Sequence, residues 1–85
     1  MVYVDNAYIP HNGKKWCHLI ADSLDELHEF AQKIGLKREW CHNEDHYDVV
    51  PSMRRIAVLN GAREVTMVEI VAIRRKLRRE SKSEQ

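Results

Sequence analysis

One helix in this chain is marked at both of its ends, and strand-forming segments lie on either side of it. Ser23-Leu24-Asp25-Glu26 has the order of a capping box, in which the serine hydroxyl accepts from a backbone N–H of the first turn. Gly35 suits the left-handed conformation in which many helices end. Between these signals, apolar residues recur at helical spacing, namely Leu24, Leu27, Ala31 and Ile34. We therefore expect a helix from about residue 23 to residue 34 that buries one face.

The segments around this helix have the composition of β-strands. Val2-Tyr3-Val4 and residues 16–21 precede the helix, and residues 46–50 follow it. A further short strand is expected at residues 38–42. Residues 10–13 are rich in turn formers and predict a loop.

Two more helices are expected in the C-terminal half. Pro51 suits a first helical turn, and that helix runs to about Asn60 before Gly61 ends it. Its apolar side would consist of Met53, Ile56, Ala57 and Leu59. Val65 is expected in a brief strand, and Thr66-Met67-Val68-Glu69 is a second capping box. The last helix has apolar residues at Met67, Ile70, Val71 and Leu77.

Arg74 interrupts the apolar stripe of this last helix. We therefore expect its final turns to leave the body of the protein and fray, and residues 81–85 to form a disordered tail.

The order of these elements predicts an α/β or α+β fold. We expect a small sheet of three or four strands, mixed or parallel, with three helices packed on it. The step from residue 16 to residue 50 favours a right-handed crossover. A chain of 85 residues predicts one domain, over residues 1–80, and a core near the size that only just offsets chain entropy. We therefore also expect a homodimer.

Composition excludes several classes of protein. Hydrophobic residues make up 44% of the chain, which argues for a globular core and against disorder. No apolar run approaches the roughly 18 residues of a membrane span, so no membrane partner is expected. The start of the chain lacks the pattern of a signal peptide, which predicts a cytoplasmic protein. Cys17 and Cys41 are too few for a disulfide scaffold and suit reduced thiols.

A net charge of +1 hides an uneven distribution. Basic residues gather near the C-terminus, at Arg74, Arg75, Lys76, Arg78, Arg79 and Lys82. One interpretation is a nucleic-acid contact through Arg74, Arg75, Arg78 and Arg79. The other is a solvated helix end whose cations complement the helix dipole.

Two histidine segments, Trp16-Cys17-His18-Leu19 and His46-Tyr47-Asp48-Val49, are the candidates for a functional site. In so short a chain we expect them to meet in space. Imidazoles titrate near neutrality, so His18 and His46 could serve as acid and base with Asp5 or Asp48. That pattern predicts a phosphoester hydrolase or nuclease, with or without a divalent metal. We assign no residue as a metal ligand at this point, and the prediction requires no cofactor.

The preferred interpretation is a binding pocket for a phosphorylated or nucleotide-like small ligand. Arg38 and Arg55 would grip the phosphate, and Tyr47 would stack on a base. His18, His46 and Asp48 would orient the ligand. Three glycines in the whole chain exclude a glycine-rich phosphate loop. The structural alternatives are that Asp48 pairs with an arginine and that the two tryptophans, Trp16 and Trp40, belong to the core.

Several segments agree in order and spacing with one known family. They are Val2-Tyr3-Val4-Asp5, Trp16-Cys17-His18-Leu19, Ala21-Asp22, Glu26-Leu27-His28, Phe30-Ala31, Gly35-Leu36, Arg38, Trp40, His46-Tyr47-Asp48-Val49, Arg55, Ala57, Gly61-Ala62 and Val65-Thr66. On these segments the chain, over about residues 2–69, resembles domain of unknown function 4031, a family of bacteriophages and actinobacteria.

The resemblance implies which positions belong to the shared pattern but brings no chemistry with it. Those positions are Asp5, His18, Asp22, His28, Arg38, His46, Tyr47, Asp48 and Arg55. The two cysteines and the basic tail lie outside the pattern. A phage or prophage setting is also implied, in the cytoplasm of an infected or lysogenic host. In that setting, a nucleotide-binding protein would sequester a signalling nucleotide.

Overall fold

A computed structural model describes residues 1–43 and 45–83 of the chain. In chain order the elements are β1 (Val2–Val4), β2 (Ile9–His11), β3 (Lys14–Ala21), α1 (Leu24–Lys33), the 3-10 turn η1 (Arg38–Trp40), β4 (Tyr47–Val49), α2 (Pro51–Leu59), β5 (Arg63–Glu64) and α3 (Met67–Ser83). Three helices thus pack with a five-stranded mixed sheet, which confirms the predicted fold class and adds a strand. None of the described helices is long and apolar enough to cross a membrane.

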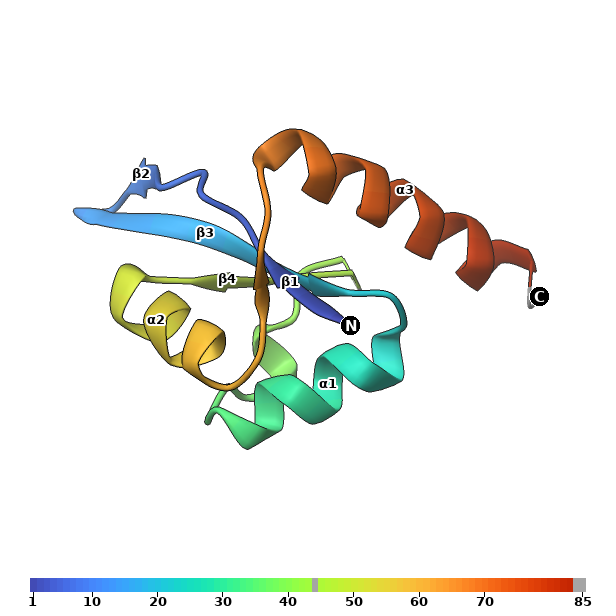
Figure 1. Cartoon of the computed structure of the whole chain (residues 1–85), viewed down its shortest axis with the longest axis horizontal. Helices are drawn as coiled ribbons and strands as arrows, with labels where there is room; N and C mark the ends of the chain where they lie inside the picture. Colours follow the sequence, from blue (N-terminus) through green and yellow to red (C-terminus); the bar gives the residue numbers. More distant parts are fainter. Residues whose placement is uncertain (44, 84–85) are drawn as a thin grey trace.

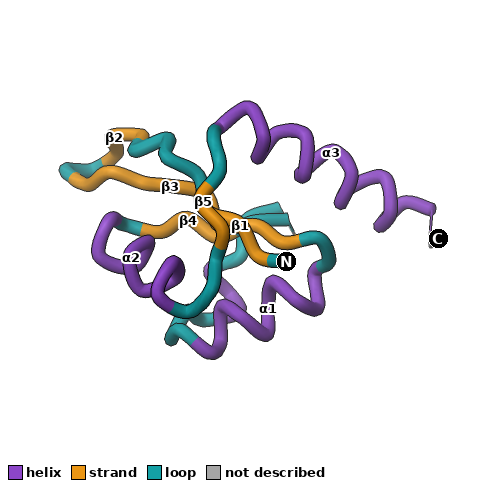
Figure 2. The backbone as a smooth tube through the Cα atoms, in the orientation of Figure 1, coloured by secondary structure: helices purple, strands orange, loops and turns teal. Residues whose placement is uncertain are grey.

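The sheet is organised around β3, its longest strand (Figure 2). Leu19 at its centre pairs with β1 on one edge and with β4 on the other, both antiparallel. The parallel pair of the sheet joins β1 to β5. The predicted right-handed crossover between residues 16 and 50 is therefore wrong. Because β4 runs antiparallel to β3, the intervening helix α1 returns the chain to the same edge in the opposite direction.

A tight hairpin joins β2 to β3, where a loop was expected at residues 10–13. Asn12 and Gly13 both have positive φ angles, +51° and +76°, as the two central residues of a hairpin turn require. Ile9 to His11 pair with Trp16 to Lys14 across that turn. The turn formers were recognised, but the pairing of the residues before them was not.

A bulge separates β1 from β2 along the same edge of β3. Val4 pairs with Leu19, and Ile9 pairs with Trp16. The five residue steps from Val4 to Ile9 therefore lie opposite only three residue steps of β3, from Leu19 to Trp16. The two additional residues lie within Asn6–Tyr8, where Tyr8 has a φ of +48°. The bulge begins directly after Asp5, and it lets the Asp5 side chain reach the backbone of β3.

The two faces of the sheet carry different layers (Figure 1). Cys17, Leu19 and Ala21 of β3 are buried in the larger core, under α1 and α2. Ile20 faces the other way and packs in a smaller cluster with Ile70 and Leu77 of α3. The side chains of this predicted strand thus alternate between the two faces of the sheet, which places His18 on the same face as α3.

Both predicted capping signals are confirmed. The Ser23 hydroxyl accepts from the backbone N–H of Glu26 at 3.2 Å, and Thr66 accepts from Glu69 at 3.2 Å. At the other end of α1, the Leu36 N–H donates to the Ala31 carbonyl at 2.8 Å, and Gly35 has a φ of +92°. This is the Schellman arrangement that a glycine after the last turn favours.

Some helix and strand predictions were wrong in detail. Residues 38–42 hold the turn η1 in place of a strand, and only His42 makes an isolated bridge, to His46. On α2, Ile56 and Leu59 are exposed, because this short helix turns only Ala57 fully into the core.

Helix α3 does not leave the body at Arg74. Leu77 is only 4% exposed, so the helix stays packed on the sheet beyond the point where fraying was expected. It continues to Ser83 and so overlaps the predicted tail at residues 81–85, of which residues 84–85 lie outside the described part of the chain. Met67 and Val71 of the predicted apolar stripe are exposed.

Candidate metal centre

The two histidine segments meet on the face of the sheet that α3 partly covers. His18 and Asp48 are direct partners in the ladder between β3 and β4, and His46 precedes Asp48 by two positions. One ligand atom from each of these three residues lies within 4.8 Å of the others. The rings of His18 and His46 stand edge to face, with their centroids 5.3 Å apart. The predicted convergence of the two segments is therefore present, and we call these three residues the His18–His46–Asp48 cluster.

A fully buried carboxylate fixes the ring of His18. Asp5, which is 0% exposed, places Oδ2 2.7 Å from Nδ1 of His18. Its Oδ1 accepts from the backbone N–H groups of His18 and Ala7, at 2.8 and 3.2 Å. The carboxylate therefore holds Nδ1 and leaves Nε2 of His18 as the nitrogen available for a ligand.

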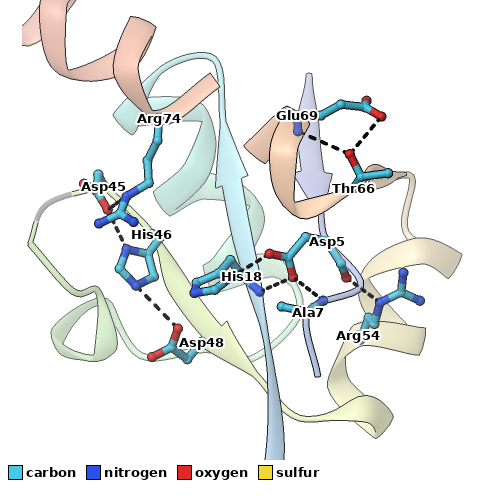
Figure 3. A network of polar contacts seen from close by, with 10 residues as sticks. All are labelled: Asp5, Ala7, His18, Asp45, His46, Asp48, Arg54, Thr66, Glu69 and Arg74. Atoms are coloured by element: carbon cyan, nitrogen blue, oxygen red, sulfur yellow. Dashed lines mark hydrogen bonds and ion pairs between the residues drawn. The ribbon is translucent and has the colours of Figure 1, made fainter. Parts of the chain in front are cut away.

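A second buried carboxylate fixes His46 in the same way (Figure 3). Asp45, which is 1% exposed, lies 2.5 Å from Nδ1 of His46, and Nε2 of His46 lies 3.4 Å from Asp48. Two arginines of α3 also donate to this carboxylate, Arg74 at 3.2 Å and Arg78 at 2.9 Å. The charge of Asp45 is thus balanced from the far side of the site.

The electrostatics keep the carboxylates of the site ionised. Burial raises the pKa of Asp5 and of Asp45, but hydrogen bonds outweigh burial and the pKa of each is lowered. A hydrogen bond with His46 lowers the pKa of Asp48. Burial lowers the pKa of His46, but its bonds to Asp48 and Asp45 outweigh burial and raise the pKa. The site therefore presents ionised carboxylates next to imidazole nitrogens.

The donor set of the cluster suits a divalent transition metal. Two imidazole nitrogens and one carboxylate oxygen are ligands that Zn²⁺ and Mn²⁺ accept. Histidines that bind metals nearly always donate their other ring nitrogen to a carboxylate or carbonyl, and both histidines here have such a partner. The side chains of His18 and Asp48 are 20% and 31% exposed, so ligand positions would stay open to solvent. Within the described residues no other trio of potential ligands comes together, and neither cysteine belongs to this one.

A cleft of about 860 Å³ opens beside the cluster, between the β2–β3 hairpin and the segment of η1, β4 and α2. His18, His42 and Asp48 line one part of it, and Nε2 of His42 lies 3.2 Å from Asp48. Trp16 and Trp40 also line it, so neither tryptophan is a fully buried core residue. The Trp16 indole donates to the His11 carbonyl at 3.1 Å.

The structure does not bring every predicted ligand-binding residue to this place. Tyr47 points into the larger core, where its hydroxyl lies 2.8 Å from Nδ1 of His28. Arg38 on η1 and Arg55 on α2 are exposed, and neither lines the cleft. Arg74 and Arg78 bring guanidinium groups to the site, although the sequence suggested either a nucleic-acid contact or a solvated helix end for them.

Two features of the site were missed at the level of sequence: the carboxylate of Asp45 and the contact of α3 with it. Asp45 was not among the predicted site residues, although it directly precedes His46. No local pattern reports the contact with Arg74 and Arg78, because 29 and 33 positions separate them from Asp45.

Comparison with known families gives one match. The family model described as "Protein of unknown function (DUF4031)" matches residues 2–77. The chain belongs to this family. The resemblance predicted from the sequence is confirmed, and the DUF4031 match extends past residue 69 to include Arg74. The searches of curated proteins and of solved structures returned no match.

Proposed function

We propose that this DUF4031 protein binds one divalent transition-metal ion between His18, His46 and Asp48 and hydrolyses a phosphate ester there. The observation that carries the proposal is the three ligand atoms within 4.8 Å, with each histidine backed by a buried carboxylate. Such second carboxylates fix the tautomer and orientation of a metal-binding imidazole. A structural ion pair would not require two of them.

A bound divalent ion would supply an activated water and a Lewis acid for the phosphoryl oxygen. In the overall reaction, water bonds to phosphorus, the ester P–O bond breaks, and one proton of the water ends on the released alcohol. The exposed sides of His18 and Asp48 leave room for both reactants. His42, beside Asp48, is placed to hydrogen-bond a substrate oxygen.

The charges around the cluster favour an anionic substrate. Arg74 and Arg78 together more than balance the buried Asp45. Lys14 adds a further cation to the lining of the cleft. With a divalent ion in place, the positive charges of the site would outnumber the negative charges of Asp5 and Asp48. A phosphate group would therefore bind favourably.

Calorimetry tests the metal site. The chelator-treated protein should bind one Zn²⁺ or Mn²⁺ per chain, and each of H18A, H46A and D48A should lower the affinity by more than about 100-fold. H11A is the matched control, because His11 is exposed and lines the same cleft without belonging to the cluster. Equal affinities in all four variants, or no binding by the wild type, would refute the metal centre.

Turnover is tested separately with bis(para-nitrophenyl) phosphate. Metal-loaded wild type should release nitrophenolate, and H18A should not. A protein that binds the metal and nucleotides but hydrolyses neither this ester nor a nucleotide would be a ligand-binding protein that sequesters its ligand. That second candidate is favoured by the volume of the cleft, about 860 Å³.

Helix α3 offers two further surfaces, a basic one and an apolar one. Nucleic-acid binding through α3 is limited to exposed residues such as Arg75 and Arg79, since Arg74 and Arg78 are engaged with Asp45. A homodimer would cover the exposed apolar residues Met67, Val68 and Val71 of α3. DNA binding measured at a series of salt concentrations tests the nucleic-acid contact, and light scattering tests the homodimer. The cytoplasm of a phage-infected or lysogenic host remains the proposed location.

A further inference from the structure

The wall of the cleft beside the cluster is largely apolar and aromatic, which metal binding alone does not require. Its apolar lining consists of Ile9, Pro10, Trp16, Leu36, Trp40, Val49, Val50 and Met53. Trp40 is 49% exposed and Ile9 is 42% exposed, although both are large hydrophobic side chains. Exposed apolar surface gathered in a concave site indicates a ligand.

The two tryptophans line this cleft from different elements. Trp16 belongs to the β2–β3 hairpin, and its hydrogen bond to the His11 carbonyl fixes the indole. Trp40 closes η1, with the ammonium of Lys37 5.6 Å from its ring. Two indoles that line one cleft provide flat surfaces on which a planar ring stacks.

We propose that the cleft binds a mononucleotide, with its base against Trp16 and Trp40 and its phosphate at the His18–His46–Asp48 cluster. This inference rests on the proposed function, because the metal would hold the phosphate. A volume of about 860 Å³ lies in the range of small-molecule sites, which span roughly 300–1,000 Å³.

The polar residues of the lining favour a heterocyclic base over a plain hydrocarbon. His11, Lys14 and Glu39 stand among the apolar side chains and offer both donors and acceptors. A lipid chain would leave these groups without partners, at a cost in free energy. A base has polar edges around an apolar face and satisfies both kinds of surface.

The chain provides its own probe of this site, because Trp16 and Trp40 are its two tryptophans and both line the cleft. Intrinsic fluorescence of the Zn²⁺- or Mn²⁺-loaded protein should change on addition of AMP. Ribose 5-phosphate and inorganic phosphate, which lack the base, should bind more weakly by calorimetry and change the fluorescence less. Adenosine, which lacks the phosphate, should also bind more weakly than AMP.

Substitution separates the base site from the metal site. W40A should lower the affinity for AMP by about 5- to 100-fold, as expected for loss of one stacking partner, and leave the affinity for ribose 5-phosphate unchanged. L59A is the matched control, because Leu59 is 77% exposed and lies outside the cleft. W16F tests Trp16, the other tryptophan that lines the cleft, while retaining an aromatic ring at this position.

The two proposals fail in different ways. If the wild type binds metal but AMP binds no better than ribose 5-phosphate, or W40A behaves like L59A, the base site is refuted and the metal centre stands. If calorimetry detects no metal while AMP still changes the fluorescence and W40A still weakens it, the metal centre is refuted and the aromatic site stands without it.

Discussion

At the scale of single residues, the site depends on two buried carboxylates that face away from the cleft. An ionised carboxylate in a low-dielectric interior is costly unless hydrogen bonds and charges compensate it. Asp5 is compensated by two backbone N–H groups and His18, and Asp45 by His46, Arg74 and Arg78. Both residues therefore hold the imidazole rings in place, and the ring nitrogens opposite them are the ones proposed to bind the metal.

Asp45 gives a direct test of such positioning. D45N keeps the shape of the side chain but removes the charge that orients the imidazolium or imidazole of His46. We expect the affinity for Zn²⁺ to fall by about 10- to 100-fold in calorimetry. D25N, on the exposed first turn of α1, is the control. If D45N binds the metal as tightly as D25N, Asp45 is only a structural partner of α3.

At the scale of elements, α3 contacts the rest of the protein through a few apolar residues and two ion pairs. Ile70 and Leu77 pack against Ile20, and Arg74 and Arg78 bind Asp45 on the same side. Arg74 looked like an interruption of an apolar stripe, but its position on the packed face is what lets it reach a buried carboxylate. The helix thereby connects to His46, a proposed metal ligand, through one intervening residue, Asp45.

The attachment of α3 can be measured by truncating its buried anchor. L77A should lower the free energy of unfolding by about 2–5 kcal/mol, because a fully packed leucine is replaced by a cavity. V68A, on the same helix but 80% exposed, should change it by no more than about 0.5 kcal/mol. Urea unfolding supplies both values. Similar values for the two variants would mean that α3 is not docked as described.

At the scale of the whole molecule, the sheet separates the larger hydrophobic core on one face from the candidate metal centre on the other. Side chains of β3 alternate between the core under α1 and α2 and the opposite face, where His18 lies. The larger core lies on the first face, while the other face holds both the smaller cluster around Ile20 and the charged groups of the site, under the 17-residue helix α3. Stability and metal affinity should consequently respond to pH through the site.

The metal-free protein should be most stable at an intermediate pH and should lose stability toward both acid and alkaline pH. The pKa values of Asp5, Asp45 and Asp48 are lowered by folding, so their contribution is complete above about 3.9 and is lost as the pH falls through the folded values. The pKa of His46 is raised, so its contribution is complete below about 6.5 and is lost as the pH rises through the folded value.

We therefore expect the metal-free protein to be most stable between about pH 4 and 6.5. Urea unfolding over a pH series in the presence of a chelator measures this profile. D45N should flatten the acid side of it, and a D45N profile parallel to that of the wild type would contradict the assignment.

Local signals in the sequence determined α1 at both ends, the start of α3 and the alternation of β3, because each depends on hydrogen bonds or side-chain spacing within a few residues. The same alternation separated Tyr47 from His46 and Asp48 and placed it on the core face. Only the tertiary structure decided that β4 pairs antiparallel to β3 and that Arg74 and Arg78 bind Asp45. These contacts join segments distant in the chain, so their free energy depends on how the layers pack and leaves no periodic trace in the sequence.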